Sequence, residues 1–127
     1  MSLDAIYREQ IMDHFKNPRN FGKLDSCTFK FSDQNPFCGD ELEMFVKIDN
    51  QKISMIKFCG KGCSISQAAA SMLTEFVIGK TLDEVEKMSR EDIIQMLGIP
   101  IGVVRVKCAV LSLVALKNGI AKYKKGE

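Results

Sequence analysis

The sequence is poor in the residues that most often mark hydrolytic catalysis. It has no tryptophan and a single histidine, His14, among 127 residues. A Cys/His hydrolase needs a histidine beside its nucleophile, and His14 lies far in sequence from every cysteine, so this enzyme class is disfavoured. We expect His14 to be a surface or packing residue of a helix.

Strong charge bias and long apolar runs are also missing. The net charge is only +2, and Lys and Arg alternate with Asp and Glu, so the sequence does not predict a basic face for nucleic acid. No window approaches the ~18 consecutive apolar residues of a membrane span. The N-terminus lacks the apolar region and cleavage site of a signal peptide. We therefore expect a cytoplasmic protein that binds neither nucleic acid nor membrane, organised as a single domain over residues 1–127.

Cysteine, in contrast, is frequent. There are five cysteines, an odd number, and no secretory signal accompanies them. In a reducing compartment such thiols more often bind metal or take part in catalysis than form disulfides.

Hydrophobic spacing predicts an α+β fold. A 3/4 pattern predicts a helix over 3–16, and β-prone runs with alternating polarity predict three strands, at 27–31, 41–49 and 52–58. Helices are then expected over 65–79, 81–88, 89–98 and 108–123, with 101–107 as a β-branched connector. Short connections favour a three-stranded antiparallel sheet with helices packed on one face.

A turn between the first two predicted strands contains Cys38 and, two residues later, Asp40. Gly39 separates them and allows positive φ, so the loop can direct both side chains toward one point. A thiol and a carboxylate at this spacing are able to face a single ion.

Two further cysteines are expected at the beginnings of helices. Cys63 ends the Gly-flanked loop CGKGC, and Cys108 begins the last predicted helix. A helix N-terminus has partial positive charge and free N–H groups, which favour a thiolate. Together with Cys38 and Asp40, these residues form the inventory of a four-ligand site for zinc, iron or an iron–sulfur cluster. Since free cysteine is often simply part of a core, buried structural cysteines remain the alternative.

The other two cysteines are interpreted as structural. Cys27 precedes a strand and has neither a carboxylate nor a helix start beside it. Cys59 is only four residues before Cys63, but it follows the alternation of the third strand and is expected to point away from the site.

Several segments in order resemble the iron–sulfur cluster assembly scaffold family, known as IscU, SufU or the N-terminal domain of NifU. They are YREQIMDHFKNPRNFG, NPFCGD, GCSISQAAASMLTEFVIGKTLDEV and KCAVLSLVALKNGI. The resemblance implies a scaffold that takes persulfide sulfur from a cysteine desulfurase and iron from a donor, builds a [2Fe-2S] cluster and releases it to apo-proteins. It also implies that the ligands are Cys38, Asp40, Cys63 and Cys108.

The chain departs from the family in two places. IscU-type members usually have histidine immediately before the third ligand cysteine, where this chain has Lys107, as SufU-type members do. SufU-type members also have an insertion of about twenty residues between the second and third cysteines, which is missing here. The segment IPIGVVRVKC lacks the Leu-Pro-Pro-Val-Lys motif, so the sequence does not predict release by a dedicated Hsp70 chaperone.

Three hypotheses follow from these features. The first is a cluster scaffold, a carrier more than an enzyme, and the missing insertion favours it. The second is a SufU-type zinc-dependent sulfurtransferase, which Lys107 favours; the third is a structural zinc domain. The persulfide acceptor is left open among Cys38, Cys63 and Cys108, as is the question whether one chain or a homodimer holds the cluster. Zinc in the protein as purified is compatible with the first two.

Overall fold

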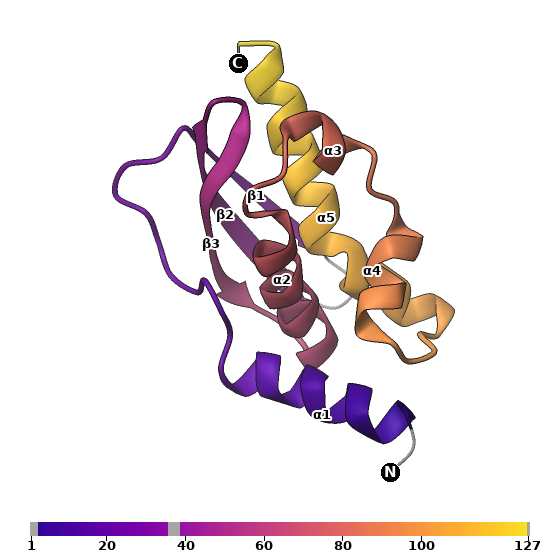
Figure 1. Cartoon of the computed structure of the whole chain (residues 1–127). Coiled ribbons are helices and arrows are strands. Elements are labelled where there is room, and N and C mark those ends of the chain that lie inside the picture. Colours follow the sequence, from indigo (N-terminus) through magenta and orange to yellow (C-terminus); the bar gives the residue numbers. More distant parts are fainter. Residues whose placement is uncertain (1–2, 36–38, 127) are drawn as a thin grey trace.

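Three antiparallel strands form the sheet on which the described chain is built. The computed structural model describes residues 3–35 and 39–126. The strands are β1 (Phe29–Asn35), β2 (Asp40–Asp49) and β3 (Lys52–Lys61), and they lie in the order β1-β2-β3 (Figure 1). The antiparallel sheet expected from the sequence is confirmed.

Helices cover one face of this sheet. They are α1 (Leu3–Lys16), α2 (Ser64–Val77), α3 (Leu82–Glu86), α4 (Arg90–Leu97) and α5 (Val103–Lys124). α2 and α5 pack against each other and against the strands, while α1 packs on α2 and α4 lies beside α5 (Figure 1). The fold is therefore of the predicted α+β class.

The alternation of β2 decides which side chains enter the core. Leu42, Met44 and Val46 are at most 4% exposed and face the helices, whereas Glu41 and Lys47 point to the other face and are exposed. Each such apolar side chain contributes about 1.5–3 kcal/mol of burial free energy. Asp40 is two residues before Leu42 and therefore lies on the same face of β2. The strand alternation that buries the core side chains thus also places this carboxylate on the helix-covered face.

The prediction for the first strand was wrong in its boundaries. Residues 32–35 were interpreted as a turn because of their polarity, but they continue β1 and pair with 40–43 of β2. β1 is an edge strand in which side chains on one face are exposed, so polar residues are tolerated there. Pairing with β2 overrides the local turn propensity.

The predicted start of the last helix was also wrong. The 101–107 segment was expected to be a connector, but α5 begins at Val103 after Gly102 as N-cap, and Cys108 is inside the helix. β-branched residues lower helix propensity only slightly, and packing of the following apolar turns extends the helix backward. The expectation that Cys108 has a helix start beside it therefore fails.

Capping signals, in contrast, were reliable. Thr81 caps α3, where its hydroxyl accepts from the Glu84 N–H and the Glu84 carboxylate accepts from the Thr81 N–H. Gly98 ends α4 in the left-handed conformation, with φ of 72°.

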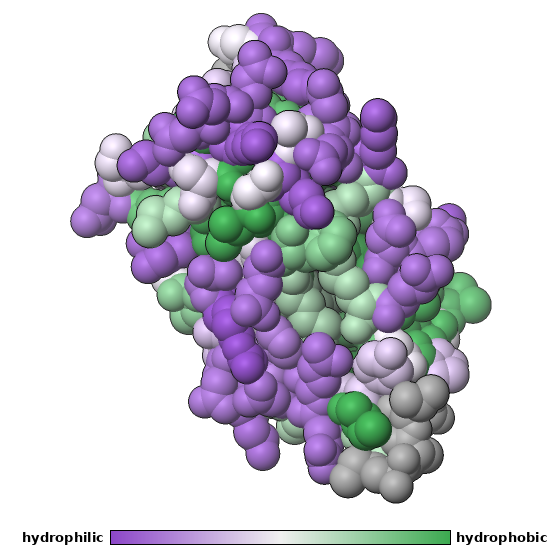
Figure 2. All heavy atoms as spheres, viewed as in Figure 1, coloured by the Kyte–Doolittle hydropathy of each residue, from purple (hydrophilic) through white to green (hydrophobic). Residues whose placement is uncertain are grey.

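An apolar area lies in the middle of the face formed by α2 and the helices beside it, surrounded by hydrophilic side chains (Figure 2). Phe76, which is exposed, lines shallow grooves here together with Met72 and Met96. Among the residues that the structure describes, no helix is both long and apolar enough to span a membrane.

A buried polar contact joins α1 to α2. His14 is 5% exposed, and its Nδ1 lies 2.7 Å from Ser71 Oγ, which also accepts a hydrogen bond from the Arg19 backbone N–H. His14 Nε2 lies 3.8 Å from a carboxylate oxygen of Glu75. His14 is thus a packing residue. Burial, and next the charge of Arg19, hold its pKa below the ordinary value.

This lowered pKa predicts a loss of stability in mild acid. The unfolded chain takes up a proton at about pH 6.5 and the folded chain only at lower pH. The contribution of neutral, buried His14 to the free energy of unfolding is therefore complete above about pH 6.5. It is lost as the pH falls through the pKa of His14 in the folded protein. In urea unfolding at pH 7.5, 6.5 and 5.5, His14→Gln should be less stable at pH 7.5 but should lose less stability on acidification than the unsubstituted protein. Equal losses in the two proteins would contradict this assignment.

Candidate metal centre

Asp40 is the first residue of β2 and is 1% exposed. Its Oδ1 accepts a hydrogen bond from the backbone N–H of Cys63 at 3.0 Å. Its Oδ2 is buried and has no hydrogen-bond partner among the residues that the structure describes. Burying a carboxylate oxygen without a partner costs free energy, and a bound metal ion would supply that partner. Oδ2 is therefore a candidate ligand atom.

Cys63 is the N-cap of α2, as the sequence predicts. Its backbone is extended, with φ −73° and ψ 169°, and its Sγ accepts from the Ser66 N–H at 3.4 Å. The residue is partly exposed, so reagents and partners have access to this sulfur.

Cys108 approaches from the other side, from α5. It is 1% exposed, and its Sγ accepts a long hydrogen bond, 3.9 Å, from the side-chain Nδ2 of Asn35 at the end of β1. Three separate elements thus meet at this end of the sheet.

The ligand atoms of these three residues converge. One carboxylate oxygen of Asp40 and the Sγ atoms of Cys63 and Cys108 all lie within 4.8 Å of one another. A tetrahedral zinc ion with bonds of about 2.0–2.3 Å needs ligand atoms about 3.3–3.8 Å apart, so a small closure would suffice. Two soft sulfurs and one harder oxygen form a donor set suited to zinc or iron.

Gly62 makes this convergence possible. A Cβ on Gly62 would lie 2.5 Å from Asp40 Oδ1 and 3.1 Å from Ser66 Oγ. Only glycine therefore leaves the carboxylate room to reach the N–H of the next residue. Sequence reasoning noted the glycine-flanked loop but did not identify this role, and it missed Asn35 altogether, because both roles depend on contacts between residues far apart in sequence.

The remaining predicted ligand, Cys38, lies outside the described residues. Next to it, Gly39 has φ of 71°, and its N–H donates to the carbonyl oxygen of Asn35 at 2.9 Å.

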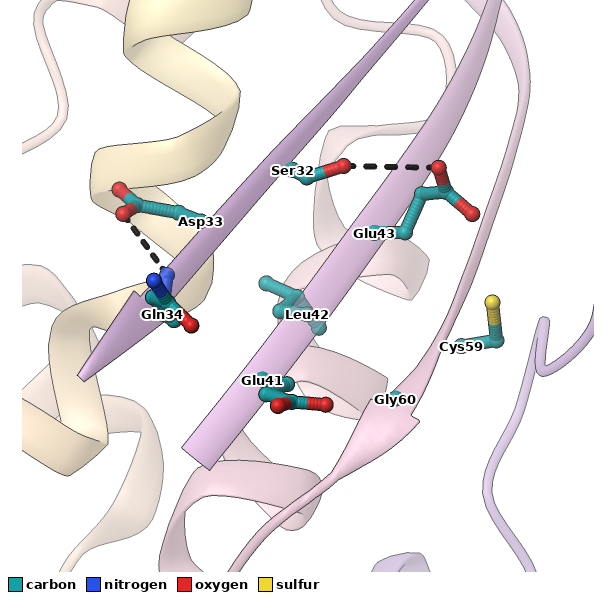
Figure 3. A pocket seen from close by; sticks show the side chains of 8 residues that line it. All are labelled: Ser32, Asp33, Gln34, Glu41, Leu42, Glu43, Cys59 and Gly60. Atoms are coloured by element: carbon teal, nitrogen blue, oxygen red, sulfur yellow. Dashed lines mark hydrogen bonds between the residues drawn. The ribbon is translucent and has the colours of Figure 1, made fainter. Parts of the chain in front are cut away.

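The other two described cysteines are not part of this cluster. Cys59 is within β3, opposite Glu43, where it lines a depression on the open face of the sheet together with Ser32 (Figure 3). Asp40 is on the helix-covered face instead. Cys27 precedes β1 and lines a separate depression with Phe45. Both positions agree with the expectation that these thiols are not ligands of this centre.

Comparisons with known proteins agree with the fold and with the order of the motifs. The sequence profile described as "NifU-like N terminal domain" matches residues 6–127. The zinc-dependent sulfurtransferase SufU of Bacillus subtilis is 39% identical, with 98% of this chain and 96% of that protein covered. The iron–sulfur cluster assembly scaffold protein IscU of Escherichia coli K12 is 35% identical, covering 93% and 94%.

Solved structures are similar over almost their whole length. The FiSufU protein of the SUF system from Fervidobacterium islandicum AW-1 superposes with a TM-score of 0.78 at 31% identity, covering 91% of this chain and 97% of that one. The NifU-like N-terminal protein of Brucella abortus gives a TM-score of 0.80 at 21% identity, covering 99% and 100%, and supports the fold alone.

The exposure of the thiols predicts an order of alkylation. In the folded, metal-free protein, iodoacetamide should modify Cys63, Cys59 and Cys27, which are partly exposed, at least about tenfold faster than the buried Cys108. Peptide mapping by mass spectrometry at increasing reaction times measures each rate. The same experiment in denaturant is the control, and there the difference should disappear. Rapid native labelling of Cys108 would contradict the buried position.

Proposed function

Because the chain belongs to the NifU-like N-terminal domain family, we propose that it is a scaffold for iron–sulfur cluster assembly. In this role it receives sulfur from a cysteine desulfurase, combines it with iron to form a [2Fe-2S] cluster and passes the cluster to apo-proteins. The proposed ligands are Cys38, Asp40, Cys63 and Cys108.

The observation that carries this proposal is the convergence of Asp40, Cys63 and Cys108, in which the Asp40 carboxylate has one oxygen without a partner among the described residues. A structural role alone gives no reason to bury an acceptor without a donor. An iron ion that bound Oδ2 and both sulfurs would satisfy this oxygen. Cys38 supplies the fourth ligand by its position in sequence, two residues before Asp40.

Sulfur enters by thiol–persulfide exchange. A thiolate of the site attacks the terminal sulfur of the desulfurase persulfide; a new S–S bond forms and the desulfurase thiolate leaves. Converting two such sulfurs to sulfide takes four electrons. Two ferrous ions supply two of them as they become ferric, and a dithiol reductant supplies the other two. The partly exposed Cys63 is the most accessible of the described ligand thiols.

The mixed donor set suits a cluster that must also leave. Thiolates are soft ligands that bind iron and sulfide firmly, whereas a carboxylate is harder and exchanges more readily. Asp40 Oδ1 already accepts a hydrogen bond from the Cys63 N–H, which leaves Oδ2 as the oxygen without a partner among the described residues. Asp40 would act as the ligand that is displaced first.

A second candidate is a zinc-dependent sulfurtransferase. The similarity to SufU of B. subtilis favours it, as does Lys107, whose ammonium group has no lone pair for metal. The aligned stretch, however, is 143 residues long, longer than this 127-residue chain, so that relative has residues with no counterpart here. When bound, zinc would keep the ligand thiols deprotonated. The chain would then contribute only a thiolate that accepts the persulfide sulfur.

Reconstitution separates the two functions. The metal-free protein is incubated anaerobically with ferrous iron, a cysteine desulfurase, cysteine and a dithiol, and the product is then mixed with an apo-ferredoxin. We expect the visible absorption of a [2Fe-2S] cluster to develop on this protein and then to move to the ferredoxin.

The control reaction omits the scaffold and should load the ferredoxin more slowly. A parallel reaction uses protein loaded with one zinc ion. If the metal-free protein develops no cluster absorption, while the loaded protein keeps its zinc and acquires persulfide on a cysteine, the sulfurtransferase is supported and the scaffold is rejected.

A pair of glycine substitutions tests the site itself. In Gly62→Ala the new Cβ displaces the Asp40 carboxylate, so Co²⁺ or Zn²⁺ should bind about 10–100-fold more weakly, the range found when the support of a metal ligand is removed. Gly102→Ala is the matched control, because a Cβ there meets nothing within 4 Å. Affinity is measured by competition with a chromophoric chelator. Unchanged affinity in Gly62→Ala would argue against Asp40 as a ligand.

A further inference from the structure

Each described member of the metal centre accepts a hydrogen bond. Asp40 Oδ1 accepts from the Cys63 N–H and Cys63 Sγ from the Ser66 N–H, both backbone donors. Cys108 Sγ accepts from Nδ2 of Asn35, a side-chain donor. Of these three donors, the Asn35 side chain is the one that a substitution can remove while leaving the backbone unchanged.

Asn35 is well placed for this contact. It is the last residue of β1, directly opposite Asp40 in the antiparallel register, and it is 6% exposed. Its carbonyl oxygen accepts from the Gly39 N–H, so the residue also ties the end of β1 to the residue before β2. Asn35 thus connects the β1–β2 hairpin to the sulfur on α5.

We propose that Asn35 is a positioning residue for Cys108. Its amide directs the sulfur toward Asp40 and Cys63 and, once metal is bound, donates an N–H···S hydrogen bond to the ligating thiolate. The inference rests on the proposed function of the site and adds a residue outside its ligand set.

Two physical effects follow from this role. An oriented ligand loses less side-chain entropy when metal binds, so Asn35 raises affinity. An N–H donor to a ligating sulfur also withdraws electron density from it, as hydrogen bonds to cluster sulfurs do when they tune reduction potentials. Without the donor the thiolate gives electrons to the metal more easily. Its charge-transfer absorption then moves to longer wavelength.

The probe is Co²⁺ added to the metal-free protein, because thiolate-to-cobalt charge transfer reports directly on the ligating sulfurs. Asn35→Leu keeps a similar volume but has no donor. Gln34→Leu is the matched control: it is the same amide-to-alkyl change one residue earlier, on an exposed side chain that lines the open face of the sheet (Figure 3). Asn35→Ser, whose side chain is too short to reach the sulfur, is a second variant in case the leucine variant does not fold.

We expect Asn35→Leu and Asn35→Ser to bind Co²⁺ about 10–100-fold more weakly, with the charge-transfer band at longer wavelength. Gln34→Leu should match the unsubstituted protein in both respects. A band that does not move overturns the proposal, even if affinity falls, because Asn35 would then only shape the hairpin. If the unsubstituted protein shows no thiolate band at all, the proposed function itself fails.

Discussion

The hydrogen bond from the Cys63 backbone N–H to Asp40 Oδ1 is the contact on which the metal centre depends. It joins the first residue of β2 to the N-cap of α2, and it partners one oxygen of a carboxylate that is almost completely buried. Without this donor, and the positive end of α2 beside it, an ionised Asp40 would be costly to bury. The glycine at position 62 is required because any Cβ would occupy the space of that carboxylate.

The sheet brings the two ends of this contact together. β2 and β3 form a hairpin that begins at Asp40, turns at Asn50 and Gln51, both with positive φ, and returns to Lys61. The buried alternation of β2 fixes the face on which Asp40 lies. A register shift of one residue would turn the core side chains to solvent and carry Asp40 away from Cys63. The burial of the β2 core side chains therefore also stabilises the position of Asp40 beside Cys63.

Sequence periodicity could predict the parts of this arrangement that are local. The alternation of β2, the capping box at Thr81 and the helix start at Cys63 each depend on neighbouring residues, and each is found in the structure. Cys108 is an example of what sequence periodicity could not predict. Its place inside α5 follows from an exposed first turn, at 103–107, that local propensity did not predict to be helical, and its contact with Asn35 joins residues 73 apart in sequence. Propensity carries no information on such contacts.

The two thiols of the described site consequently have different environments. Cys63 is partly exposed at a helix N-terminus and accepts from a backbone N–H, whereas Cys108 is buried within a helix and accepts from a side-chain amide. Of these two thiols, Cys63 is therefore the more accessible from solvent.

Only one of the two carboxylate oxygens of Asp40 accepts a hydrogen bond from the described residues, and this also bears on the release of a cluster. A carboxylate with both oxygens free can chelate a metal ion, but Asp40 has committed Oδ1 to the protein backbone and offers Oδ2 alone. A metal ion bound through Oδ2 would be held by a single bond to Asp40, and loss of that bond would leave the Cys63 N–H still partnered by Oδ1. This property suits a site from which a cluster must depart more than one that must retain zinc.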